Sequence, residues 1–326
     1  MTAEAVLLQH KHEQRDIAAA TIAASEVQQM NDGRAGVRTG QISAASGDGV
    51  NFVTEGRFTV IKTASEVWLD GCEIYWDHSA NAATCIPRLA AGDKDFYLGT
   101  ADGDATSAAT SGVVNLNVRP TYIIDLQRDP FLTAVVKTVV GSTTVEVPHI
   151  EPAGGSQAMI LGTTAEAQKV DLLSERSFAP GCKWILEAEI NIVTNSDNAA
   201  GDFNIGVASA THATDADAIA ESAFFHTNGN DLNIYAECDD GTNETAATDT
   251  TVDFVAGTPV SLVIDGRDLT DLHYYVNAVE VLASTTFLVS AMAGPLKALA
   301  HLEKTSDDSP GYYKINRLRV RTAERA

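Results

Sequence analysis

The feature that most constrains the fold is the alternation of residue types in residues 182–192. Apolar side chains occupy every second position, and polar side chains largely fill the positions between them. A period of two predicts a β-strand with one face in a core and one in water. The alternation recurs at 203–207, 223–226, 232–238, 260–264, 272–277, 279–282 and 313–320. Strands of this length joined by Gly, Asn and Asp loops predict a two-sheet antiparallel jelly-roll sandwich over residues 169–326.

Residues 41–120 show the same period in shorter strands. Gly56–Lys62 alternates, and Gly or Asp punctuation returns about every ten residues. No amphipathic helix separates these strands, which disfavours a parallel α/β sheet. We therefore expect a small β-barrel-like domain in an all-β chain, with Trp76 buried beside Phe58 and Asp77 capping the loop that follows.

The remaining segments join and precede these two domains. Residues 2–30 are rich in Ala, Gln and Glu, which favours a short helix or an extended N-terminal arm. Residues 121–168 contain β-branched runs on both sides of Val139–Thr143, which predicts a connector with a β-hairpin. The expected order is thus an arm (1–40), a small β domain (41–120), a connector (121–168) and a sandwich (169–326).

The charge balance excludes some classes of partner. The chain has 22 Lys and Arg against 44 Asp and Glu, a formal net charge of −22. Such a surface argues against nucleic-acid binding. No apolar stretch of 18 residues occurs, so we expect no membrane segment and a product made in a cytoplasm. The four cysteines have no metal-ligand spacing, which predicts buried free thiols.

The motifs of the small β domain resemble those of a known family. The pattern G-x-F-x-V-x-K at 56–62 is followed by G-x-x-x-Y-W-D at 71–77, by Leu-Gly-Thr-Ala at 98–101 and by Val-Asn-Leu-Asn-Val at 114–118. In this order, over about residues 41–118, they resemble the head decoration (cement) proteins of tailed, lambda-like phages.

The resemblance implies a structural virion protein without enzymatic activity. It would bind the major capsid protein on the outside of an assembled phage capsid and stabilise the shell, and family members are commonly homotrimers. Within the region of resemblance, the predicted capsid contacts are Gly56, Arg57, Tyr75 and Asp77.

The C-terminal half resembles lectin-like or laminin-G-like jelly rolls. The resemblance lies in residues 259–264 and in His-Tyr-Tyr-Val-Asn at 273–277, with Ala278 where those folds usually have Gly. It implies an architecture, and it leaves a carbohydrate-binding adhesin as the alternative function. Sugar binding would require exposed aromatic side chains. The candidates, which core packing also explains, are Trp184, Phe203, Phe224, Phe225, Tyr235, Tyr274, Tyr275 and Tyr312.

A search for reactive constellations yields no catalytic centre. None of the G-x-S-x-G, H-E-x-x-H, P-loop or C-x-x-C motifs occurs. Glu187 and Glu189 share a strand face, as a glycosidase pair would, but alternating acids on a solvated face are the plainer interpretation. The loops 195–202 and 237–244 carry calcium-type oxygen ligands without EF-hand spacing. We therefore predict no cofactor and no metal, with calcium left as an alternative at these loops.

Overall fold

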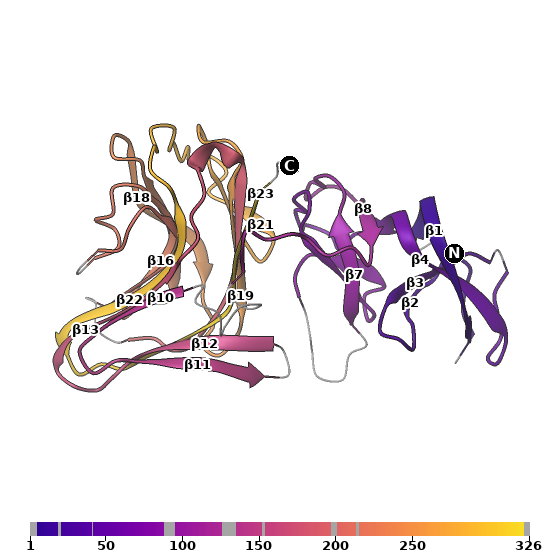
Figure 1. The fold of residues 1–326 in the computed structure, drawn as a ribbon, viewed down its shortest axis with the longest axis horizontal. Helices are drawn as coiled ribbons and strands as arrows, with labels where there is room; N and C mark the ends of the chain where they lie inside the picture. Colours follow the sequence, from indigo (N-terminus) through magenta and orange to yellow (C-terminus); the bar gives the residue numbers. More distant parts are fainter. Residues whose placement is uncertain are drawn as a thin grey trace. The chain divides into compact units, whose positions relative to one another are not determined.

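The computed structural model describes residues 5–18, 21–40, 42–87, 95–125, 135–151, 154–196, 201–212 and 215–322. The chain divides into two compact units, residues 1–121 and 122–326 (Figure 1). Apart from the short 3-10 helix η1 (Pro180–Cys182), the regular elements of these residues are strands, so the predicted all-β class is confirmed. No helix in the described part of the chain has the length and apolarity to span a membrane.

The first unit is one curled antiparallel sheet. Its strand order is β2-β3-β4-β8-β7-β5-β6, and β1 also pairs with β4. The backbone of Lys62, just past β4, forms a bridge with Ala83 in β6, which brings the two sides of the sheet together. The strands are β1 (Ala5–Ile17), β2 (Val27–Gln29), β3 (Ala35–Arg38), β4 (Gly49–Ile61), β5 (Glu73–Asp77), β6 (Ala82–Thr84), β7 (Phe96–Ala101) and β8 (Ser111–Leu116).

Of the two forms expected for the N-terminal residues, a short helix or an extended arm, the helix is wrong. Residues 5–17 form β1, which pairs with β4 from Ala5 opposite Val60 to Ile17 opposite Gly49. Helix propensity is a weak local preference, and pairing along a long strand overrides it because the hydrogen bonds satisfy backbone groups of both strands. Residues 1–4 and 19–20 of the predicted arm lie outside the described residues.

The core of the first unit contains Trp76 and Phe58, the two side chains that were predicted to be buried there. Trp76 and Phe58 are buried in the same apolar cluster. Asp77 Oδ1 accepts hydrogen bonds from Ser79 Oγ (2.7 Å) and from the Ala80 amide (2.8 Å), so it caps the next turn as predicted.

The second unit is a sandwich of two antiparallel sheets, as the sequence predicts. One has the order β10-β13-β22-β15-β16-β17-β18, and the other has β11-β12-β23-β14-β19-β20-β21 with β9 beside β23. Figure 1 shows them as two layers, with β16 and β22 in one and β19 and β23 in the other. The strands are β9 (Ile124–Asp125), β10 (Val135–Val140), β11 (Thr144–Glu151), β12 (Gly154–Leu161), β13 (Glu166–Ser174), β14 (Trp184–Thr194), β15 (Asp202–Ala208), β16 (Ser222–Asn228), β17 (Asn233–Asp239), β18 (Glu244–Asp253), β19 (Val260–Gly266), β20 (His273–Val276), β21 (Val279–Val281), β22 (Lys297–Asp307) and β23 (Gly311–Thr322).

The segment expected as a connector contributes strands to both sheets of the sandwich. β10 and β11 flank the turn predicted for a hairpin, but β10 pairs with β13 and β11 pairs with β12 in the other sheet. The hairpin of this segment is therefore β11–β12, with Glu151 opposite Gly154. A turn between two β-branched runs can join paired strands of one sheet or strands of two different sheets. The local sequence does not distinguish these two cases.

The alternation in β14 predicts one face correctly and the other in part. The five apolar residues of the alternating face are buried in the core between the sheets, namely Trp184, Leu186, Ala188, Ile190 and Ile192. Glu187, expected in water, is also buried, since Arg321 Nε donates to its carboxylate at 2.8 Å and the Tyr122 hydroxyl donates at 2.9 Å. The outer face of this sheet is thus partly covered.

Replacing Ala278 with glycine is expected to stabilise the second unit by about 1 kcal/mol. Asn277 and Ala278 form the two-residue turn between β20 and β21, and both have positive φ, 49° and 62°. Glycine adopts this conformation without the Cβ clash that alanine incurs, although it also gains entropy in the unfolded chain. Urea unfolding of Ala278→Gly beside wild type measures the difference, and an equal or lower midpoint would contradict the assignment of strain to this turn.

Candidate functional site

Two of the predicted capsid contacts line a hollow on the first unit. The hollow has a volume of about 470 Å³ and lies along β4 and the end of β8, so we call it the β4–β8 hollow. Gly56 has φ +136°, a conformation that favours glycine. The residues that line the β4–β8 hollow are Arg34, Thr54, Glu55, Gly56, Arg57, Asn115, Leu116, Asn117 and Val118.

The walls of the β4–β8 hollow are held by polar side chains. Arg57 forms an ion pair with Asp102, and about half of its side chain stays exposed (49%). Asn117 Nδ2 donates to the carbonyls of Ala35 (2.8 Å) and Thr54 (2.7 Å). Asn117 Oδ1 accepts from the Ala35 amide at 2.9 Å. These bonds tie β3 and β4 to the residue after β8, which makes the hollow a rigid feature.

Tyr75 and Asp77, the other two predicted contacts, do not line the hollow. Both lie on β5, which β8 and β7 separate from β4 in the sheet. The Tyr75 hydroxyl donates to Glu73 at 2.7 Å, and its ring packs edge-on against Tyr97. Because the Asp77 carboxylate caps its own turn, the structure gives it a local role.

A row of buried polar side chains crosses the seven-stranded sheet of the second unit. Asp171, His301, Asn204 and His226 are successive register partners on β13, β22, β15 and β16. None of the four is more than 3% exposed. Their chain neighbours point into the core between the sheets, so the row lies on the other face.

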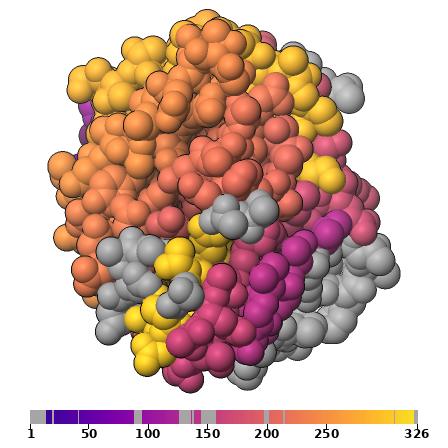
Figure 2. All heavy atoms as spheres, turned by 90° about the vertical axis from the view of Figure 1, so that its left-hand side faces the viewer, coloured from indigo at the N-terminus to yellow at the C-terminus, as the bar shows by residue number. Residues whose placement is uncertain are grey.

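The segment between β15 and β16 explains how this outer face is buried. Ala216 and Ile219 pack with Phe224 and Leu299 in a small second apolar cluster on that face. Figure 2 views the second unit from this side, where residues coloured salmon to orange make up a large part of the visible surface. A sheet face that would otherwise be solvated therefore carries an added layer.

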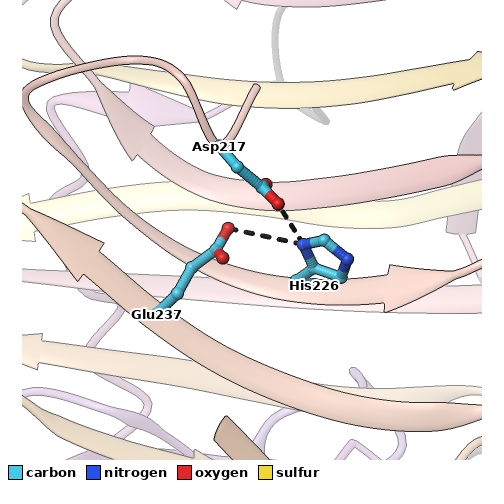
Figure 3. A group of neighbouring side chains, drawn as sticks. All are labelled: Asp217, His226 and Glu237. Carbon is cyan, nitrogen blue, oxygen red and sulfur yellow. Dashed lines mark hydrogen bonds and ion pairs between the residues drawn. The ribbon is translucent and has the colours of Figure 1, made fainter. Parts of the chain in front are cut away.

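Asp217 of this layer and His226 and Glu237 of the sheet form a cluster, which we call the carboxylate–histidine cluster (Figure 3). His226 Nδ1 lies 3.1 Å from Asp217 Oδ1 and 3.5 Å from Glu237 Oε1. Burial lowers the pKa of His226, but the two carboxylates outweigh burial and raise this pKa to about 11. Burial raises the pKa of Glu237. The cluster can hold a proton or a cation between its carboxylates.

A second histidine in the row has its own acidic partners. His301 Nδ1 lies 2.6 Å from Asp171 Oδ1, and its Nε2 lies 3.2 Å from Glu303 Oε2. Burial lowers the pKa of His301, but its hydrogen bonding to the carboxylates of Asp171 and Glu303 outweighs burial and raises the pKa to about 9. Lys169 Nζ adds a cation 3.0 Å from Asp171 Oδ2.

Sequence reasoning missed both histidine clusters because their members come from separate strands. Of the cluster members, Glu237 alone belonged to a predicted acidic loop. Asp202 of the other loop lies 3.6 Å from His226 Nε2, and burial raises its pKa to about 6. Asp197 and Asn198 of the first loop lie outside the described residues. In the second loop, Asp240 accepts amide hydrogen bonds from Thr242 and Asn243 and so stabilises its own turn.

The aromatic residues considered for sugar binding are mostly internal. Six of the eight are buried, and Tyr235 and Tyr312 are half-buried. Tyr274, for example, donates a hydrogen bond to the Glu237 carbonyl at 2.6 Å inside the core. Core packing therefore accounts for most of these residues, and the described ones offer no broad aromatic platform.

The solved structures that this chain matches share little sequence with it. A structure from work on endo-acting O-glycanases of the human gut microbiota has 12% identity and a TM-score of 0.45, covering 63% of this chain and 100% of its own. The Emp47p carbohydrate recognition domain has 10% identity and a TM-score of 0.41, covering 58% and 89%. A family 16 endo-glucanase of Bacteroides ovatus has 8% identity and a TM-score of 0.43, covering 58% and 95%. At these values the similarities carry no conclusion about ligand or activity.

The first unit has a match at the level of sequence families. No curated protein matches the chain. Residues 8–116 match the model described as phage cement protein. The match begins before the motifs at 56–118 and takes in β1 to β3, in agreement with the sheet that those strands share with β4. The resemblance expected from the motifs is confirmed, and over residues 8–116 this chain matches the phage cement protein family.

Proposed function

We propose that this chain is a head decoration protein that binds the outside of an assembled phage capsid and stabilises it, displaying its sandwich outward. The match of residues 8–116 to phage cement proteins carries the proposal. A cement protein buries surface across the seam between capsid subunits, so parting the shell must also break its contacts. This role requires no catalytic residue.

The β4–β8 hollow is the proposed contact surface. It is concave, rigidly held, and lined by Gly56 and Arg57 from the motif that first indicated the family. An exposed guanidinium in a chain of net charge −22 offers a local positive group for a carboxylate or a carbonyl of the capsid protein. Tyr75 and Asp77 are proposed as a separate, peripheral part of the footprint.

Trimeric assembly would give such a surface useful affinity. One module buries only a modest interface, and three linked modules convert later contacts into intramolecular ones. We propose a homotrimer on this basis, and sedimentation velocity of the free protein measures it.

The protein is expected to bind assembled, undecorated heads and not unassembled capsid protein. A site that spans several subunits is complete only in the shell, so co-sedimentation of the full chain with each form separates the two cases. Arg57→Glu, which reverses the exposed charge in the hollow, is expected to weaken head binding at least about tenfold.

The matched control is Arg176→Glu, because Arg176 is an exposed arginine of the second unit. It should leave head binding unchanged. Binding to neither form, or equal binding to both, would contradict the cement function. If the wild-type chain binds heads and both variants, Arg57→Glu and Arg176→Glu, lose affinity equally, the result would contradict only the assignment of the β4–β8 hollow as the contact surface.

A further inference from the structure

Four side chains of the second unit converge on one point from separate segments. Asp217 comes from the segment between β15 and β16, which we call the covering segment. His226 comes from β16, Glu237 from β17 and Asn204 from β15. The ligand atoms of Asp217, His226 and Glu237 all lie within 4.8 Å of one another. The two distances from His226 Nδ1, 3.1 and 3.5 Å, bracket the roughly 3.4 Å between neighbouring ligands of a tetrahedral zinc ion.

Asn204 supplies an independent observation that points to a cation. Its side chain is fully buried, and its Nδ2 lies 2.6 Å from Asp217 Oδ1 and 3.0 Å from Glu237 Oε1. The same nitrogen is 3.2 Å from His226 Nδ1. Its Oδ1 has no hydrogen-bond partner among the described residues. Rotating the Asn204 amide by half a turn would direct Oδ1 toward the cluster. An oxygen beside two carboxylates is repelled by them, so this orientation is favourable only when a cation is bound among the three groups.

The surroundings of His226 also suit a metal ligand. Its Nε2 donates to Asn228 Oδ1 at 3.0 Å, which orients the ring so that Nδ1 faces the cluster. The Asp217 side chain is 36% exposed, so an ion can reach the cluster from solvent.

We propose that Asp217, His226, Glu237 and Asn204 bind one divalent transition-metal ion of the Zn²⁺ and Mn²⁺ class. The ligands are one carboxylate oxygen from each acid, His226 Nδ1 and Asn204 Oδ1. A mixed nitrogen and oxygen set of four suits these ions, whereas Ca²⁺ takes six to eight oxygen ligands. The ion joins the covering segment to β15, β16 and β17 and so stabilises the outer layer of the sandwich.

Titration of the chelator-treated full chain tests the proposal. Isothermal calorimetry with ZnCl₂ or MnCl₂ should give one ion per chain. At about 100 times Kd, the thermal midpoint of the second unit should rise by roughly 5 to 10 °C, because the ion binds only the folded state. CaCl₂ at the same concentration should shift it little.

Two variants and one control keep the test specific. Asp217→Asn preserves shape and should weaken binding at least about tenfold. Asp253→Asn makes the same charge change on exposed β18 of the same sheet and should leave affinity unchanged. Asn204→Asp adds a third carboxylate to the cluster. Its thermal midpoint should therefore be lower than that of wild type in chelator, and the rise of the midpoint on adding Zn²⁺ should be larger. Absence of Zn²⁺ and Mn²⁺ binding, equal affinity in Asp217→Asn, or a response to Ca²⁺ alone would overturn the proposal.

Discussion

Replacing Trp76 with alanine is expected to reduce the free energy of unfolding of the first unit by roughly 3–5 kcal/mol. Trp76 is 1% exposed and packs in the cluster that contains Phe58 and Val114. Removing the indole deletes a large apolar surface and leaves a cavity. The sheet cannot collapse readily into this cavity, because the bridge between Lys62 and Ala83 holds its two sides together.

Denaturant unfolding of the full chain measures this effect in one unit at a time. Trp68 remains as a fluorescence reporter in the first unit, and Trp184 reports on the second. Only the first transition should move, since the two units have separate cores. Val118→Ala, at a half-exposed position of the first unit, should change stability by less than about 0.5 kcal/mol. An unmoved first transition in Trp76→Ala would show that the indole is not a core side chain.

Replacing Glu187 with glutamine is expected to cost the second unit roughly 3–5 kcal/mol at pH 7, because it removes the carboxylate charge that pairs with the buried Arg321 guanidinium. Burial raises the pKa of Glu187, but the charge and hydrogen bond of Arg321 outweigh it and hold the pKa below its ordinary value of 4.5. The stabilisation is therefore present above about pH 4.5 and is lost as pH falls through the folded pKa.

A double-mutant cycle with Arg321→Met separates this pair from general damage. Removing both partners should destabilise the unit by clearly less than the sum of the single changes, since no unpaired buried charge remains. Urea unfolding at pH 7 and at pH 4 provides the values, and the gap between wild type and Glu187→Gln should shrink at the lower pH. If the losses of unfolding free energy in the two single variants add up in the double variant, the ion pair is not the cause of the destabilisation. A difference between wild type and Glu187→Gln that grows at pH 4 would exclude it as well.

The candidate sites were predictable to different degrees. Gly56 and Arg57 are adjacent in the chain and belong to one motif, so a single local pattern located one wall of the β4–β8 hollow. Asn117, which closes the hollow, lies in the motif at 114–118 but was not among the predicted contacts. The sequence gives only a weak indication of the carboxylate–histidine cluster. It is a polar residue between two apolar neighbours on a strand, as Asn204 is between Phe203 and Ile205.

The sequence by itself determined the all-β class, the apolar face of β14 and the burial of Trp76. Alternation with a period of two is a property of neighbouring residues, so no knowledge of partners is needed to assign it. Only the tertiary structure decided that residues 5–17 are a strand, that β10 and β11 enter different sheets, and that Glu187 and His226 are buried. The physical reason is that alternation assigns a side chain to a face, whereas strand pairing and the segments packed on that face determine its neighbours and its exposure to water.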